Sequence, residues 1–116
     1  MATLRTKEKE EEYQQYVREG NLANGCKLCD KQGFRTFNHW KIVANDFPYD
    51  RIAKTHDMIV SIRHVGEDGL SREELEEFKK IKEEHIFATY EYIVEPVHKK
   101  KSIPGHFHLH LITTKE

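Results

Sequence analysis

Apolar residues recur at helical spacing in two segments of the chain. Residues 6–19 are rich in charge and carry apolar side chains three or four positions apart, which predicts a short amphipathic surface helix. A longer helix is predicted to begin at Ser71, because Ser71 and Glu74 have the spacing of a capping box. Apolar residues then follow at intervals of three or four as far as Ile93, and Pro96 is expected to end the helix.

Short runs rich in β-branched residues predict the strands. The segments 39–45 (HWKIVAN) and 56–62 (HDMIVSI) are bounded by turn-forming residues, as strands usually are. Residues 34–37 have the composition of a shorter strand, and the alternating run at 106–112 (HFHLHLI) predicts the last one. These elements indicate the α+β class, and we expect an antiparallel β-sheet of about five strands with the long helix packed on one face.

The length of the chain is that of one domain. A chain of 116 residues supports a single core but not a second one. We therefore expect residues 1–116 to form a single domain, with residues 1–20 as a charged N-terminal helix or arm. The sequence contains no internal repeat, low-complexity tract or linker.

Charge and hydropathy restrict the classes of partner. The 20 acidic and 19 basic residues nearly cancel, so the overall charge does not favour a specific nucleic acid or an acidic membrane as partner. No apolar run approaches the roughly 20 residues needed to cross a bilayer, and the N-terminal segment lacks the apolar core of a signal peptide. We expect a soluble, cytoplasmic protein.

The last predicted strand carries histidine at every second position. Because side chains alternate along a strand, the three histidines share one face, which we expect to be open or concave, while the apolar residues between them face the core. The outer two would lie about 13 Å apart at roughly 3.3 Å per residue. Three interpretations follow, namely a solvated strand face, a metal site built on two histidines, or a division of labour between a metal-bound histidine and a nucleophile or general base.

The two cysteines of the chain form a CxxC pair, Cys26 and Cys29. In a reducing compartment such a pair is more often a metal or redox site than a structural disulfide. Redox pairs of the thioredoxin type lie between a strand and a helix, and no strand signal precedes Cys26. A metal site is the favoured interpretation.

Two segments of the sequence resemble the histidine triad (HIT) superfamily of nucleotide hydrolases and transferases. The run HFHLHLI matches the triad motif, in which three histidines alternate with apolar residues, at every position. The segment ANDFPYDRIAKTHDMIVSIRHV resembles the strand–turn–strand unit that precedes the triad in that superfamily. The resemblance runs from about Cys26 to Ile112, with Ser61 in place of a family proline and HKKKSIPG in place of the glycine-rich segment before the triad.

The resemblance implies a role for each matching residue. His108 looks like the nucleophile that attacks the α-phosphate of a nucleotide and forms a covalent nucleotidyl-histidine. His110 would donate a hydrogen bond to the phosphate oxygens or orient the nucleophile, and His56 matches a further histidine near the triad. Asn45 occupies the position that binds the ribose hydroxyls, and Ser102 the position that contacts the phosphate or the leaving group.

In the zinc-containing branch of the superfamily, the CxxC pair supplies two metal ligands. A histidine after the second strand and the first triad histidine supply the others, so the resemblance implies a structural zinc site formed by Cys26, Cys29, His64 and His106. Such a closed set leaves no open position for catalysis, and it would hold the strand that bears His108.

The expected activity is cleavage at the α-phosphate of a phosphoric anhydride, ester or phosphoramidate, with a nucleotide or nucleotide conjugate as the partner molecule. One alternative is a metalloenzyme whose catalytic metal is bound by the histidines of the triad strand. Another is a nucleotide-binding module of the same fold with little turnover. Many relatives form homodimers, so a homodimer is an expectation from the resemblance, although no residue of the sequence requires it.

Overall fold

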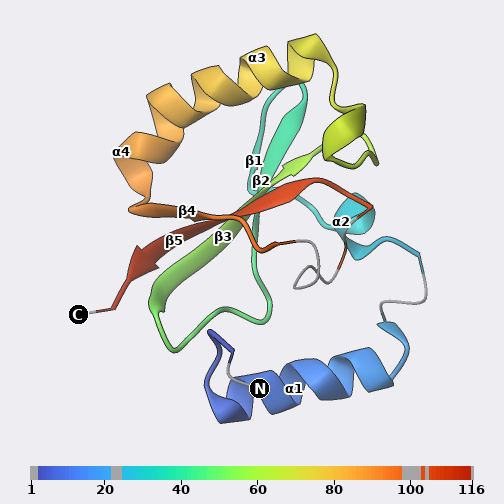
Figure 1. The fold of residues 1–116 in the computed structure, drawn as a ribbon, viewed down its shortest axis with the longest axis vertical. Helices are drawn as coiled ribbons and strands as arrows, with labels where there is room; N and C mark the ends of the chain where they lie inside the picture. The colour runs from blue at the N-terminus through green and yellow to red at the C-terminus, as the bar shows by residue number, and fades with distance from the viewer. Residues whose placement is uncertain (1–2, 22–24, 98–102, 104, 116) are drawn as a thin grey trace.

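A computed structural model describes residues 3–21, 25–97, 103 and 105–115, and its centre is an antiparallel sheet (Figure 1). The sheet has five strands in the order β1-β2-β3-β5-β4. The α+β class and the sheet expected from the sequence are confirmed. The strands are β1 (Arg35–Thr36), β2 (Trp40–Ala44), β3 (Ala53–Ser61), β4 (Tyr92–Val94) and β5 (His108–Thr114).

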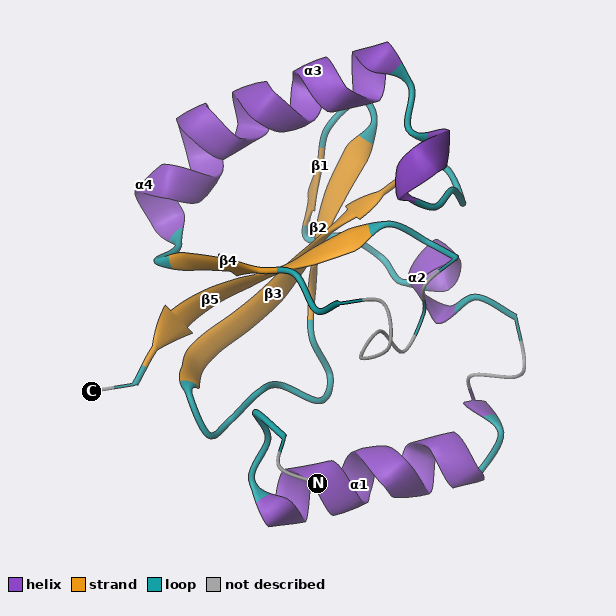
Figure 2. Cartoon of the chain, viewed as in Figure 1, coloured by secondary structure: helices purple, strands orange, loops and turns teal. Residues whose placement is uncertain are grey.

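A continuous helical segment covers one face of the sheet (Figure 2). It consists of α3 (Arg72–Ile81), a π-helical turn (Lys82–Ile86) and α4 (Phe87–Thr89). Its buried side chains, Ile81 and Ile86, join an apolar core with residues of β2, β3 and β5. Burial of such apolar surface is the main stabilising contribution to the fold.

The predicted start of the long helix is confirmed, whereas its predicted end is wrong. Ser71 Oγ accepts a hydrogen bond from the backbone N–H of Glu74 at 3.1 Å, and the Glu74 carboxylate accepts one from the N–H of Ser71 at 2.8 Å, which completes the capping box. The helix ends at Thr89, well before Pro96, and Tyr92–Val94 form the edge strand β4. Tyr92–Val94 pair with β5 instead, and the β-branched side chains of Ile93 and Val94 suit a strand.

The other face of the sheet carries the histidines. Met58 of β3 is opposite His110 of β5, and Val60 is opposite His108. This face is not open, because His106 and His110 are buried and a second apolar cluster forms on it around Leu28. Of the open or concave face that the sequence predicted, the structure has the concave form, because α2 (Lys27–Asp30) and the loop between β2 and β3 (residues 45–52) add a layer there and leave a cleft lined by His108 and His110.

The predicted N-terminal helix is present as α1 (Lys7–Arg18), which lies across the molecule from α3 (Figure 1). Thr6 is its N-cap and accepts a hydrogen bond from the backbone N–H of Lys9. None of its residues is buried, as expected for a charged amphipathic segment. Among the helices of the described residues, none has both the length and the apolar character that crossing a bilayer requires.

Candidate functional site

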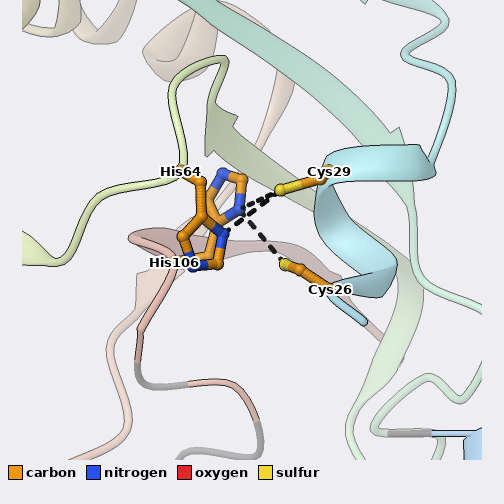
Figure 3. A group of neighbouring side chains, drawn as sticks. All are labelled: Cys26, Cys29, His64 and His106. Atoms are coloured by element: carbon orange, nitrogen blue, oxygen red, sulfur yellow. Dashed lines mark hydrogen bonds between the residues drawn. The ribbon is translucent and has the colours of Figure 1, made fainter. Parts of the chain in front are cut away.

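Two cysteines and two histidines converge at one end of the sheet (Figure 3). Cys29 Sγ lies 3.2 Å from Nδ1 of His64, and Nδ1 of His106 lies 3.4 Å from both sulfur atoms. One possible ligand atom from each of the four residues, Cys26, Cys29, His64 and His106, lies within 4.8 Å of the others. The four residues named from the sequence are therefore close enough to bind a metal ion together.

A local turn and the pairing of two strands explain how these ligands meet. Gly25 adopts a φ of +83°, a conformation that side-chain-bearing residues rarely take, and it turns the chain into α2. Cys26 is the N-cap of α2 and Cys29 lies in its single turn, so both thiols point the same way. His64 follows β3 and His106 precedes β5, and because β3 and β5 pair antiparallel these two positions are neighbours.

The donor set fits a tetrahedral ion. With Zn–S of about 2.3 Å and Zn–N of about 2.0–2.1 Å, tetrahedral geometry places sulfur and nitrogen about 3.6 Å apart. The observed sulfur–nitrogen separations of 3.2–3.4 Å are close to this value. The His106 ring is also oriented for the task, since its Nε2–H donates to the carbonyl oxygen of Ser61 at 2.6 Å, which leaves the lone pair on Nδ1 facing the sulfurs.

A cleft lies on the same face of the sheet, beside this cluster. Its walls come from the segment before α1, from α1, from α2, from the loop of residues 45–52 and from β5. His108 and His110 line it together with Asn45, so three of the residues predicted to contact a nucleotide share one cavity. Ser102, the remaining predicted ligand contact, lies outside the described residues.

His56 and His110 form a pair behind the cleft, and one backbone contact decides where the protons of both rings lie. The N–H of Tyr49 donates to Nδ1 of His56 at 2.9 Å, so Nδ1 carries the lone pair and the proton of the neutral ring is on Nε2. That Nε2–H donates to Nδ1 of His110 at 2.7 Å. His110 consequently holds its own proton on Nε2, which lies 3.4 Å from the Tyr49 hydroxyl at the cleft.

Burial keeps this pair uncharged. It lowers the pKa of His56 to about 4, with a further contribution from the positive charge of Arg5. Burial also lowers the pKa of His110 to about 3, with His56 as the next cause. At neutral pH His110 is therefore a neutral hydrogen-bond donor at the wall of the cleft.

His108 has a different partner and a different tautomer. Its Nδ1 lies 2.8 Å from the backbone carbonyl oxygen of His106, and since a carbonyl only accepts, Nδ1 carries the proton. The lone pair of the neutral ring is therefore on Nε2. His108 is half-buried and lines the cleft. This is the tautomer that an imidazole attacking through Nε2 requires.

Sequence reasoning did not identify two residues of the cleft. Tyr49 fixes the tautomer of His56 through its backbone N–H and contacts His110 through its hydroxyl, and its position between Asn45 and His56 was the only signal in the sequence. Arg5 lines the same cleft from the segment before α1. No motif pointed to Arg5, because its place depends on where α1 packs.

No protein-family model matches the sequence, and no match is found among the curated proteins or the solved structures. The relation to the HIT superfamily therefore stays a prediction from the motifs. Any function proposed for the chain therefore rests on its motifs and on the geometry of the cleft and of the metal cluster.

Proposed function

We propose that the protein is a nucleotide hydrolase or nucleotidyltransferase of the HIT superfamily, which cleaves at the α-phosphate through a covalent nucleotidyl-histidine on His108. One observation carries the proposal. His108 lines a cleft with its proton held on Nδ1 by the His106 carbonyl, beside a second histidine that is a neutral donor. A nucleophile and an adjacent hydrogen-bond donor are the two groups that transfer of a phosphoryl-type group needs most.

In the first step Nε2 of His108 attacks the α-phosphorus. A P–N bond to His108 forms, and the bond from phosphorus to the leaving group, P–O in an anhydride or ester and P–N in a phosphoramidate, breaks with its electron pair on the departing atom, which takes a proton from solvent. The ring becomes positively charged, and the Nδ1–H bond to the His106 carbonyl, 2.8 Å long, stabilises that charge. In the second step water or another acceptor attacks the phosphorus, its proton passes to solvent, the P–N bond to His108 breaks and the electron pair returns to Nε2.

His110 acts on the phosphate oxygens in both steps. Its Nε2–H donates a hydrogen bond to an oxygen whose negative charge grows in the transition state. His56 acts through His110 and is a positioning residue, because its Nε2–H keeps the His110 proton on the side of the cleft. Asn45 binds the ribose hydroxyls, and its Oδ1 is oriented by accepting the N–H of Phe47 at 2.8 Å.

The metal is zinc in this proposal. Two thiolates and two imidazoles are a common structural zinc set, and they leave no open coordination position. When bound, the ion would hold α2, the loop after β3 and the start of β5 together. The side chain of His106 would be a ligand while its carbonyl orients His108, so the metal centre would position the nucleophile without taking part in the reaction. Reduced cysteines as ligands support a cytoplasmic location.

A catalytic metal on the triad strand is the less favoured alternative. Nδ1 of His108 and Nδ1 of His110 are both committed to other hydrogen bonds. Within the described residues the only group of three or more ligating side chains close enough to hold a metal is the Cys₂His₂ cluster. This set has no member at the floor of the cleft.

The test is turnover of adenosine 5′-phosphoramidate and diadenosine polyphosphates by the zinc-loaded protein, with AMP release followed by chromatography. We expect His108→Ala to lose on the order of 10³-fold or more of the activity, as removal of a nucleophile does. His39→Ala, at a histidine outside the cleft, is the matched control and should retain activity. An acid-labile nucleotidyl adduct should form on the wild type but not on His108→Ala, and activity that survives this substitution would remove the nucleophile from the proposal.

A further inference from the structure

The side chain of Arg5 is built into the cleft, although Arg5 belongs to the segment before α1. It lines the same cavity as His108 and His110, and only 13% of the side chain is exposed. The guanidinium carbon lies 4.2 Å from the centre of the Tyr13 ring and 5.1 Å from that of Tyr49. Stacking of this kind fixes the plane of the guanidinium group at a defined place in the wall.

Other contacts hold the N-terminal segment without Arg5. Asp50 accepts two hydrogen bonds from Thr6, one from the backbone N–H at 2.7 Å and one from the hydroxyl at 2.9 Å. The backbone N–H of Arg51 donates to the carbonyl of Leu4 at 3.0 Å, and the Arg51 side chain donates to the carbonyl of Thr3 at 2.8 Å. A largely covered arginine is therefore not needed merely to attach this segment.

The hydrogen bonds of Arg5 leave donor capacity. Its Nε donates to the carbonyl of Phe47 at 2.7 Å, and its Nη1 donates to Glu10 at 3.1 Å. Among residues 3–21, 25–97, 103 and 105–115, its Nη2 has no hydrogen-bond partner. A guanidinium group carries five N–H donors in a planar fork, so it can keep both contacts and still bind an oxyanion.

The charges around the cleft favour an anion. Lys27 and Lys31 line it as well, and the one carboxylate that the described part of the chain places in its wall, Asp46, is paired with Lys31 at 2.7 Å. Arg5 is itself paired with Glu10 at 3.1 Å, so it offers the cleft the remaining donors of its guanidinium group, and its positive charge contributes to the low pKa of His56. A ligand that brings negative charge would gain from Arg5, whereas a neutral one would have to desolvate it.

We infer that Arg5 binds the phosphate group of the cleft's ligand, so that the N-terminal segment is part of the binding site. The inference rests on the proposed function and deepens it, because it assigns recognition of the phosphate to a residue outside the triad segments. Arg5 makes the ligand class a nucleotide with an ionised phosphate rather than a nucleoside.

The test compares the binding of AMP, adenosine and inorganic pyrophosphate by calorimetry. Arg5→Gln should weaken AMP and pyrophosphate at least about tenfold, as loss of a charge-assisted hydrogen bond does, and should leave adenosine within about twofold. Arg5→Lys should recover part of the lost AMP affinity because it keeps the charge. Arg51→Gln is the matched control, since Arg51 anchors the same segment outside the cleft, and it should change none of the three affinities.

The outcomes separate this inference from the proposed function. Equal losses for AMP and adenosine in Arg5→Gln would mean that Arg5 only supports the wall, and unchanged AMP and pyrophosphate affinity would also overturn the inference. AMP binding that depends on Arg5 without turnover of any nucleotide would leave the inference standing and remove the catalytic function. Turnover that needs His108, with the same KM in Arg5→Gln as in the wild type, would overturn the inference about Arg5 and leave the catalytic function standing.

Discussion

Nε2 of His56 lies 2.7 Å from Nδ1 of His110, and a single proton lies between the two rings. The backbone N–H of Tyr49 occupies the other nitrogen of His56, so His56 cannot gain a second proton without losing that contact. The pair is therefore stable in its neutral form, in line with the low pKa of both rings.

The pair makes folding stability depend on pH. Both pKa values are lower in the folded chain, about 4 for His56 and about 3 for His110, than the ordinary value of 6.5, so the unfolded chain binds more protons between these limits. The contribution of the pair to the free energy of unfolding is fully present above pH 6.5. It is lost as pH falls toward 4, by up to about 1.4 kcal/mol per pH unit for each histidine. Urea unfolding from pH 7.5 to 4.5 measures the slope.

The double variant His56→Gln/His110→Gln is the control for this slope. It has no titrating group at either position, while metal release at low pH would affect both proteins alike. We expect a smaller slope for the variant, and equal slopes would show that the pair does not set the pH dependence.

Loss of a metal ligand should act on stability and on metal content together. Cys29→Ser is expected to bind less than one metal ion per chain, because a three-ligand site is much weaker than a closed one. We expect the free energy of unfolding of Cys29→Ser to fall by at least about 2 kcal/mol, which would lower Tm by about 10 °C. Metal content by mass spectrometry and Tm by calorimetry test this, and His108→Ala should keep its metal. Metal lost equally from both variants would contradict a separate structural site.

Glu74 is a buried carboxylate on which several contacts converge. It is 1% exposed, it completes the capping box with Ser71, and its carboxylate pairs with Arg63 at 2.6 Å. Glu74→Gln retains the cap but leaves Arg63 without its counter-charge, so we expect a loss of roughly 1–3 kcal/mol in urea unfolding. Glu76→Gln removes only an exposed pair with Arg72 and should cost no more than about 0.5 kcal/mol. Similar losses in the two variants would refute the distinction.

Tyr90 connects the end of the helical segment to the sheet, on the face opposite to the cleft. Its hydroxyl donates to the Asp57 carboxylate at 2.5 Å, and burial followed by this bond raises the pKa of Tyr90. Tyr90→Phe should lose about 1.5–3 kcal/mol of stability, the range for a hydrogen bond to a charged group, without a change in nucleotide turnover. Tyr92→Phe, at an exposed position, should be close to neutral. A turnover defect in Tyr90→Phe would link the two faces of the sheet.

Sequence patterns predicted the elements whose signals are local. The capping box of Ser71 and Glu74 marked the start of the long helix, because its bonds join residues only three positions apart. The end of that helix was missed, since Ile93 fits a helical spacing but gains more from pairing with Leu111 of β5. That choice depends on a partner strand distant in the sequence.

The chain by itself determined which chemistry is available. Alternation put His108 and His110 on one face of β5, with His106 two positions before the strand begins, and the spacing of Cys26 and Cys29 put two thiols on one turn. Only the tertiary structure decided that His106 meets the thiols, that His110 is buried against His56, and that Arg5 enters the cleft. The physical reason is that side-chain direction follows from the local backbone, whereas proton positions, burial and charge depend on segments that meet only when β3 pairs with β5 and α1 packs beside the loop of residues 45–52.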